Sequence, residues 1–207
     1  MPKPFHNLEQ EKQQRIISAS LQEFSEKGYE QASTNQIVKN AGIGKGMLFY
    51  YFNNKRELYD YLINYCFDLV HNGYVQQIDL SEPDFIERFR QASMNKLTFF
   101  NENPFVFNFL GIIMLTEDEL LPHDTRKKIE QLQQIAYDSI YKDIDYSLFR
   151  DDIDTQKAMD LIKWSMDGYR EDISQVYKGE DIANVNMEKL TLEFTQYLDT
   201  LKIAFYK

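Results

Sequence analysis

Apolar residues recur at steps of three and four along most of the chain, which is the spacing of one face of an α-helix. No stretch shows the sustained alternation of apolar and polar residues that is typical of a strand. Most of the eight glycines and five prolines lie at the boundaries of the periodic segments. The sequence therefore predicts an all-α protein of about nine helices.

Four helices are expected in the N-terminal part of the chain. Gly28 is expected to end the first, and Ser33 or Thr34 to cap the second. A tight turn at residues 42–44 then leads into a short third helix. The four expected spans are residues 8–27, 34–41, 45–52 and 55–71.

Five further helices are expected in the rest of the chain. Pro104 and Pro122 each predict a helix start, because proline is favoured in the first turn of a helix. Asn186 is expected to cap the last helix. The five expected spans are about residues 81–100, 104–115, 122–143, 154–179 and 187–206. We place the boundary between an N-terminal domain, residues 1–53, and a helical C-terminal domain, residues 54–207.

Charge is distributed unevenly along the sequence. The chain of 207 residues has a net charge of −10, which alone argues against a nucleic-acid partner. Residues 1–60 contain eight Lys/Arg and seven Asp/Glu, whereas residues 61–207 contain 15 and 26. No acidic residue occurs from Gln31 to Arg56, a stretch with four basic residues. Since charges more than about 8 Å apart are largely screened at physiological salt, this local cationic segment can still attract an anion.

The turn after the second helix has the composition of a DNA-binding element. Two short helices joined by a tight glycine turn are typical of a helix-turn-helix, whose second helix enters the major groove. Gly42 can adopt a positive φ, and Gly44 and Gly46 lack side chains that would hold the backbone away from DNA. The hydroxyls of Tyr50 and Tyr51 can donate hydrogen bonds to phosphate oxygens.

The segment from about Arg15 to Leu62 resembles the N-terminal domain of TetR-family transcriptional repressors. The family pattern is an apolar first helix with a Gly-aromatic stop, a Thr-capped helix ending in Ala-Gly, a small-Lys-Gly turn, and a run Leu-Tyr-Tyr-His-Phe-x-x-Lys-x-x-Leu. The matching residues are Ala19, Phe24, Gly28, Tyr29, Thr34, Ile37, Ala41, Gly42, Lys45, Gly46, Leu48, Tyr50, Phe52, Lys55 and Leu58. Phe49 stands where tyrosine is frequent, and Tyr51 where histidine is frequent.

The resemblance implies that residues at the start of the second helix, on the third helix and at the start of the fourth contact DNA. These residues are Ser33, Thr34, Asn35, Lys45, Gly46, Met47, Tyr50, Tyr51 and Lys55. Lys45 can reach the O6 and N7 atoms of guanine, and Met47 can contact a thymine methyl group. Taken singly, each has an ordinary alternative: Thr34 as a helix cap, Lys45 as a solvated charge, and the tyrosines as core.

A homodimer is expected, because one such unit makes few contacts and specific binding usually uses two half-sites of a palindrome. The last two helices, residues 154–179 and 187–206, carry apolar residues in alternating steps of three and four that suit a four-helix interface. The resemblance implies the same pair. The alternative is that these apolar faces cover the core of their own chain.

The most apolar and aromatic segment, residues 99–115, predicts a site for a small hydrophobic effector. The expected lining residues are Phe100, Phe105, Phe109, Met114, Trp164 and Tyr169. The alternative is that these side chains form ordinary core. Together these features predict a ligand-responsive transcriptional regulator. The simplest form is a repressor that leaves a palindromic operator when the effector binds. Activation is not excluded by the sequence.

Other classes of protein find little support in the sequence. The three histidines, of which His6 lies in an N-terminal tail expected to be disordered, have no metal or nucleophile–base spacing, so no enzyme, metal or cofactor is expected. No leader, lipidation signal or apolar span of about 18 residues is present, so a cytoplasmic protein without membrane contact is expected. A helical small-molecule-binding or adaptor protein that does not use DNA remains the alternative.

Overall fold

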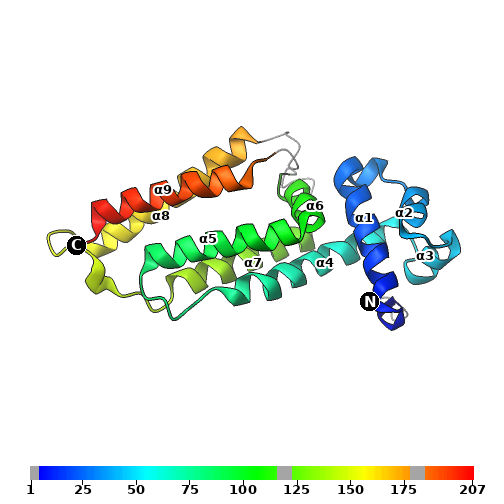
Figure 1. Ribbon diagram of the computed structural model, residues 1–207, viewed down its shortest axis with the longest axis horizontal. Coiled ribbons are helices and arrows are strands. Elements are labelled where there is room, and N and C mark those ends of the chain that lie inside the picture. Colours follow the sequence, from blue (N-terminus) through cyan, green and yellow to red (C-terminus); the bar gives the residue numbers. More distant parts are fainter. Residues whose placement is uncertain (1–4, 116–122, 178–184) are drawn as a thin grey trace. The chain divides into compact units, whose positions relative to one another are not determined.

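The computed structural model describes residues 5–115, 123–177 and 185–207, and helices joined by short turns and loops make up most of them (Figure 1). The α-helices are α1 Gln10–Gln31, α2 Thr34–Ala41, α3 Lys45–Tyr51, α4 Lys55–Gly73, α5 Phe85–Glu102, α6 Pro104–Leu115, α7 His123–Tyr141, α8 Thr155–Val176 and α9 Met187–Phe205. The only β-type pairing among the described residues is an isolated bridge between Phe149 and Tyr206. The predicted all-α class with nine helices is confirmed.

Side-chain caps fix several of the helix starts. Asp154 accepts a hydrogen bond from the amide of Lys157 at the start of α8, and Asn186 accepts one from Lys189 at the start of α9. The α6 helix begins at Pro104 and ends at Leu115, as predicted. Pro122 and residues 178–179, which were expected to begin α7 and to end α8, lie outside the described residues.

The first helix is broken near its end at the glycine expected to stop it. Gly28 has φ 68° and ψ 171°, so the chain leaves the helical conformation there and resumes one short turn up to Gln31. A residue with a side chain rarely adopts this positive φ, which explains the use of glycine at this position. The break changes the direction of the chain just before α2.

The chain divides into two compact units. The first comprises the chain up to Val70 together with Asn103–Arg126, and the second comprises His71–Glu102 and Lys127–Lys207. Helix α4 therefore belongs to the first unit for most of its length. The functional division at residue 53 stays a prediction.

The core of the first unit is built on apolar faces of α1, α2, α4 and α6. Ile16, Ile37 and Leu62 are completely buried. Phe109 of α6 is also buried, and its ring centre lies 5.3 Å from that of Tyr59 and 6.5 Å from that of Phe24. Helix α6 is thus part of the same core as α1.

A buried arginine in the second unit is held by backbone carbonyl groups. The guanidinium of Arg88, on α5, is fully buried and donates to five backbone carbonyl groups. These carbonyls belong to Leu80, Glu82, Ser139, Ile140 and Lys142. The last carbonyls of a helix have no hydrogen-bond partner within it. Arg88 supplies that partner at the end of α7 and at the same time joins this helix end to the segment before α5.

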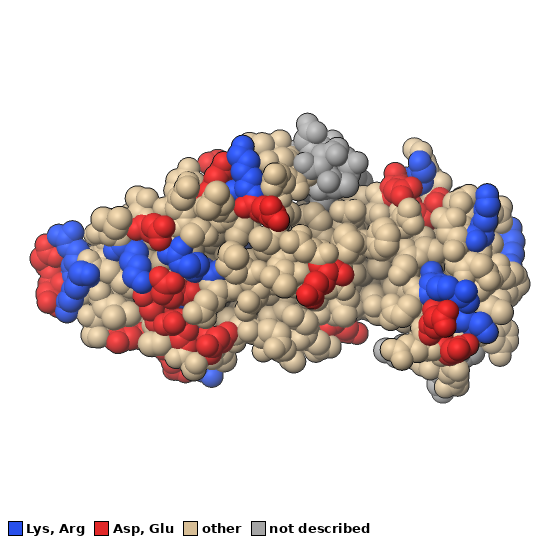
Figure 2. Space-filling view, in the orientation of Figure 1, with Lys and Arg blue, Asp and Glu red and all other residues tan. Residues whose placement is uncertain are grey.

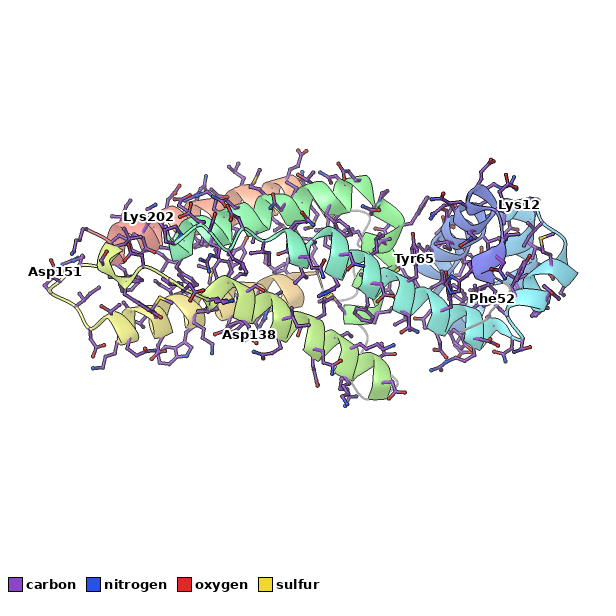
Figure 3. The ribbon with its side chains drawn as sticks, turned by 90° about the horizontal axis from the view of Figure 1, so that it is seen from below. Lys12, Phe52, Tyr65, Asp138, Asp151 and Lys202 are labelled. Atoms are coloured by element: carbon purple, nitrogen blue, oxygen red, sulfur yellow. The ribbon has the colours of Figure 1, made fainter. Side chains whose placement is uncertain are left out.

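The last turn of α9 is held to the first turn of α5. Lys202 donates to Asp84 at 2.8 Å and to Glu87 at 2.7 Å, and the hydroxyl of Tyr206 donates to Asp84 at 3.0 Å (Figure 3). Burial raises the pKa of Asp84, but hydrogen bonds from Lys202, the Glu87 amide and Tyr206 outweigh it and leave that pKa below its usual value. The ionised Asp84 carboxylate with these partners therefore stabilises the fold at neutral pH. That contribution is lost as the pH falls through the lowered pKa of Asp84.

The apolar stripes predicted on α8 and α9 are only partly buried in the second unit. Met159, Ile162 and Met166 of α8 are buried, and so is Leu198 of α9, which lies beside the predicted stripe rather than in it. Val176 and Tyr197, which belong to the predicted stripes, are exposed. The other exposed large apolar side chains are Leu161 and Trp164 on α8 and Leu192 and Ile203 on α9.

Candidate nucleic-acid interface

Two buried side chains decide which face of α3 reaches solvent. Leu48 and Phe52, four residues apart, are each only 1% exposed. The ring of Phe52 lies 4.9 Å from that of Phe5 and 5.3 Å from that of Tyr61, measured between centres (Figure 3). Seven residues are too few for a helix that is stable alone, so this anchoring holds α3 in place.

The remaining face of α3 is exposed and carries no acid. Lys45 and Gly46 are exposed, Met47 is 38% exposed and Tyr50 is 70% exposed. The ammonium of Lys45 lies 6.0 Å from the ring centre of Phe49, the residue that stands where tyrosine is frequent. The structure thus brings a cation, a thioether and a phenol together on one accessible helix surface.

Gly42 ends α2 and turns the chain toward α3. Its φ of 65° and ψ of 38° lie in the left-handed region, as the sequence predicted. The Gly42 amide donates to the carbonyl of Lys39 and the Ile43 amide to that of Val38, at 3.2 and 3.0 Å. These two hydrogen bonds form the Schellman motif that closes many helices.

The start of α2 differs from the expectation in one respect. Ser33 occupies the N-cap position with an extended backbone, but its side chain makes no capping hydrogen bond, so the expected side-chain cap is wrong. Its amide donates instead to the carboxylate of Glu23, at 2.8 Å. Ser33 and Asn35 are exposed and Thr34 is half-buried.

Lys55 has partners within the protein. Its ammonium donates to the carbonyls of Glu30 and Ala32, at 3.0 and 3.3 Å, and lies 4.8 Å from the ring centre of Tyr29. Sequence reasoning missed these contacts, because nothing in the spacing shows that the end of α1 approaches the start of α4. Lys55 supports the segment before α2, and its contact with a phosphate stays a prediction.

The N-terminal tail takes part in this region. Phe5–Asn7 form a 3-10 turn rather than the expected disordered tail, and Phe5 is completely buried. Its ring meets Tyr51 edge-on at 5.5 Å between centres, so Tyr51 is half-buried whereas Tyr50 is free to reach outward. A single aromatic residue in a short polar tail gave no periodic signal that could have identified it.

The acid-free segment folds into one surface. Helix α2, the Gly42 turn and α3 contain no Asp or Glu, and Figure 2 shows Lys and Arg side chains at the outer edge of this part of the chain. Glu57, the first acid after it, accepts hydrogen bonds from the amide and side chain of Asn53 and so is committed to the start of α4. On the second unit acidic and basic side chains are intermixed (Figure 2).

The six residues expected to line an effector site fall in both units. Phe105, Phe109 and Met114 lie on α6, and Phe109 is core of the first unit. Phe100 and Tyr169 are half-buried, and the Tyr169 hydroxyl donates to the carbonyl of Leu190 at 3.3 Å. Trp164 is 64% exposed, which does not support a place in a cavity wall. The ligand-binding role of the set stays a prediction.

The part of the chain that contains α2 and α3 matches a known family of proteins. Residues 16–62 match the family model described as bacterial regulatory proteins, tetR family. The negative transcriptional regulator IcaR of the biofilm operon icaADBC, from Staphylococcus aureus (strain Newman), is 36% identical over 58 residues, or 28% of this chain and 31% of IcaR. The match thus spans about a third of the length of that relative.

Solved structures share the fold over nearly the whole length. A TetR family transcriptional regulator from Chloroflexus aurantiacus J-10-fl has a TM-score of 0.60 at 23% identity, covering 99% of this chain and 98% of that one. The regulator FadR from Bacillus subtilis, solved in complex with stearoyl-CoA, has a TM-score of 0.58 at 18% identity, covering 89% and 96%. At these identities the likeness shows the fold alone.

Among the residues that the structure describes, none of the helices combines the length and the apolar composition of a membrane span. Within the same residues, no group of three or more His, Cys, Asp or Glu side chains is placed to hold a metal ion.

Gly42, at the end of α2, and Gly46, on α3, are expected to respond oppositely to alanine. Gly42→Ala forces a side chain into a left-handed conformation and should lower the free energy of unfolding by about 1 to 2 kcal/mol. Gly46 is helical, and a Cβ built there meets nothing within 4 Å, so Gly46→Ala should raise it by about 0.5 kcal/mol. Urea unfolding followed by circular dichroism measures both. Equal effects of the two substitutions would contradict the assigned backbone conformations.

Proposed function

We propose that this chain, whose residues 16–62 match the tetR family model, is a DNA-binding protein of that family and a ligand-responsive transcriptional repressor. In this proposal it binds a palindromic operator as a homodimer and is released when a small hydrophobic effector binds. It acts in the cytoplasm and has no catalytic role. The observation that carries the proposal is that α2, the Gly42 turn and α3 contain no Asp or Glu, while the burial of Leu48 and Phe52 leaves Lys45 and Tyr50 of α3 exposed.

The exposed side chains divide into two kinds of DNA contact. Lys45 and Met47 lie on the accessible face of the recognition helix, where an amine can reach guanine and a thioether a thymine methyl group. Ser33, Thr34 and Tyr50 offer hydroxyls that suit phosphate oxygens, which position a protein without reading sequence. Tyr51 and Lys55 are more enclosed, so we assign them mainly to holding this surface in shape.

The exposed faces of α8 and α9 support a homodimer. Ile203 is 82% exposed, and Leu161 and Trp164 are also largely exposed. Gly168 lies on the same side of α8 as Leu161 and Trp164, and a Cβ built there meets nothing within 4 Å. Large apolar side chains grouped on neighbouring helices commonly mark a protein–protein interface. Two copies would supply the two recognition helices that a palindrome requires.

Helix α6 supports the effector part of the proposal. It is the most apolar helix, and Phe105 and Met114 remain partly exposed on it. Because Phe109 of the same helix packs on Phe24 of α1, a shift of α6 would disturb the first unit. An effector that favours such a shift must bind more weakly when DNA is bound, since the coupling is reciprocal.

Lys45→Ala should weaken binding to the operator and relax the preference at one base position. The operator duplex is obtained by selecting genomic fragments of the host that the purified protein retains. Affinity should fall about tenfold, because a bidentate contact to guanine is lost. The plot of log affinity against log salt should become shallower by about one unit per recognition helix. Fluorescence anisotropy at several salt concentrations measures both.

Lys189→Ala is the matched control, because Lys189 is an exposed lysine on α9, remote in sequence from the recognition helix. It should leave affinity and salt slope unchanged. Unchanged binding by Lys45→Ala, or steady binding of the operator at all salt concentrations, would contradict the residue roles.

Ile203→Glu should convert a dimer to a monomer. Wild-type protein should have twice the chain mass in multi-angle light scattering, whereas the introduced charge cannot be buried in an apolar interface without a partner. Leu80→Glu, at an exposed apolar position before α5, is the control and should remain dimeric. A wild-type monomer, or dimers of both variants, would show that this face is not the interface.

Stearoyl-CoA, the ligand in the FadR structure, is the first effector probe. We expect it to raise the midpoint of thermal unfolding and to weaken operator binding, whereas free coenzyme A should do neither. The factor by which it weakens DNA binding should equal the factor by which DNA weakens its own binding. Binding of stearoyl-CoA without any change in DNA affinity would contradict release by this class of effector, and no binding would exclude acyl thioesters.

A further inference from the structure

The start of α2 has the sequence of a capping box, but neither half of the box is formed. Ser33-Thr34-Asn35-Gln36 fits the pattern in which the serine hydroxyl caps the third helical residue and the glutamine side chain reaches back to the serine amide. In the structure the Ser33 side chain makes no capping bond. The Gln36 side-chain amide donates instead to Asn40, at 2.8 Å.

Glu23 takes the place of the missing glutamine contact. It comes from α1, ten residues earlier, and its Oε1 accepts the hydrogen bond from the Ser33 amide at 2.8 Å. Glu23 is only 6% exposed, and a buried carboxylate is tolerated where hydrogen bonds satisfy it. Its position beside the first turn of α2 also places a negative charge at the positive end of the helix dipole.

This arrangement leaves donors at the start of α2 unused. Among the described residues, the hydroxyls of Ser33 and Thr34 and the amides of Thr34 and Asn35 make no hydrogen bond within the protein. In an ordinary N-cap the serine hydroxyl would be occupied by the helix itself. Here the hydroxyl of the cap residue makes no such bond.

We propose that Glu23 is a positioning residue for DNA binding, which fixes the Ser33 amide from another helix and so keeps the Ser33 and Thr34 hydroxyls available for a backbone phosphate. The proposal rests on the DNA-binding function proposed above. It assigns no direct DNA contact to Glu23.

The carboxylate also has an opposing effect. A negative charge close to the first turn of α2 repels a phosphate bound there, and at such a separation salt screens it only in part. The positioning role requires an acceptor atom but no charge. Glutamine keeps the acceptor and removes the charge, whereas leucine removes both, so the two substitutions separate positioning from repulsion.

The first test compares operator affinity for Glu23→Gln and Glu23→Leu. With the selected operator duplex, Glu23→Leu should bind about tenfold more weakly, and Glu23→Gln should bind at least as tightly as the wild type. Circular dichroism first establishes that both variants are folded. If both variants bind more tightly, Glu23 acts only by repulsion, and the proposal is wrong.

The second test measures how Ser33→Ala depends on Glu23. In the wild-type background Ser33→Ala should weaken operator binding while leaving the midpoint of thermal unfolding unchanged, because the hydroxyl does not cap α2. In the Glu23→Leu background the hydroxyl is expected to turn inward and cap the helix. There Ser33→Ala should lower the midpoint by about 2 to 4 °C without further loss of DNA affinity.

An equal fall of the midpoint in both backgrounds would overturn the proposal, because it would show that Ser33 already caps α2. Failure of the wild-type protein to bind any duplex would overturn the proposed function instead. The thermal measurements need no DNA, so they still decide whether Glu23 relieves Ser33 of capping. The two failures are therefore distinguishable.

Discussion

The burial of Leu48 and Phe52 is the constraint on which the candidate interface depends. A helix of seven residues gains too little from its own hydrogen bonds to persist, so its orientation follows from the two side chains that it buries. Phe52 meets Phe5 and Tyr61 in one aromatic cluster. With that face fixed, Lys45 and Tyr50 are exposed on a segment, residues 31–56, that contains no Asp or Glu although the net charge of the chain is −10.

The charged groups nearest to this surface have internal partners. Glu23 accepts from the Ser33 amide, Lys55 donates to the carbonyls that precede α2, and Glu57 accepts from Asn53 at the start of α4. Each bond holds backbone at a point where a helix begins or ends, where amides and carbonyls lack helical partners. The candidate interface is therefore shaped by ionic side chains that need not themselves contact DNA.

Local features of the sequence predicted local features of the structure. The positive φ of Gly42 and the start of α6 at Pro104 follow from properties of single residues, and the nine helices follow from apolar periodicity. Contacts between distant segments could not be predicted in this way. The burial of Phe5 and the bond from Glu23 to α2 depend on which elements meet in space. Periodicity also identified an apolar stripe on α8. It did not show that Leu161, which lies outside this stripe, is an exposed apolar residue of the same helix.

The most direct measurement of the central claim is the sequence of host genomic fragments retained by the purified protein at moderate salt. The account predicts enrichment of one pseudo-palindromic site whose half-sites are spaced by about one or more helical turns of DNA. It also predicts that protein carrying Lys45→Ala enriches the same site less sharply at one position of each half. Retention of fragments without any common sequence, or no retention above that of an unrelated acidic protein, would contradict the account.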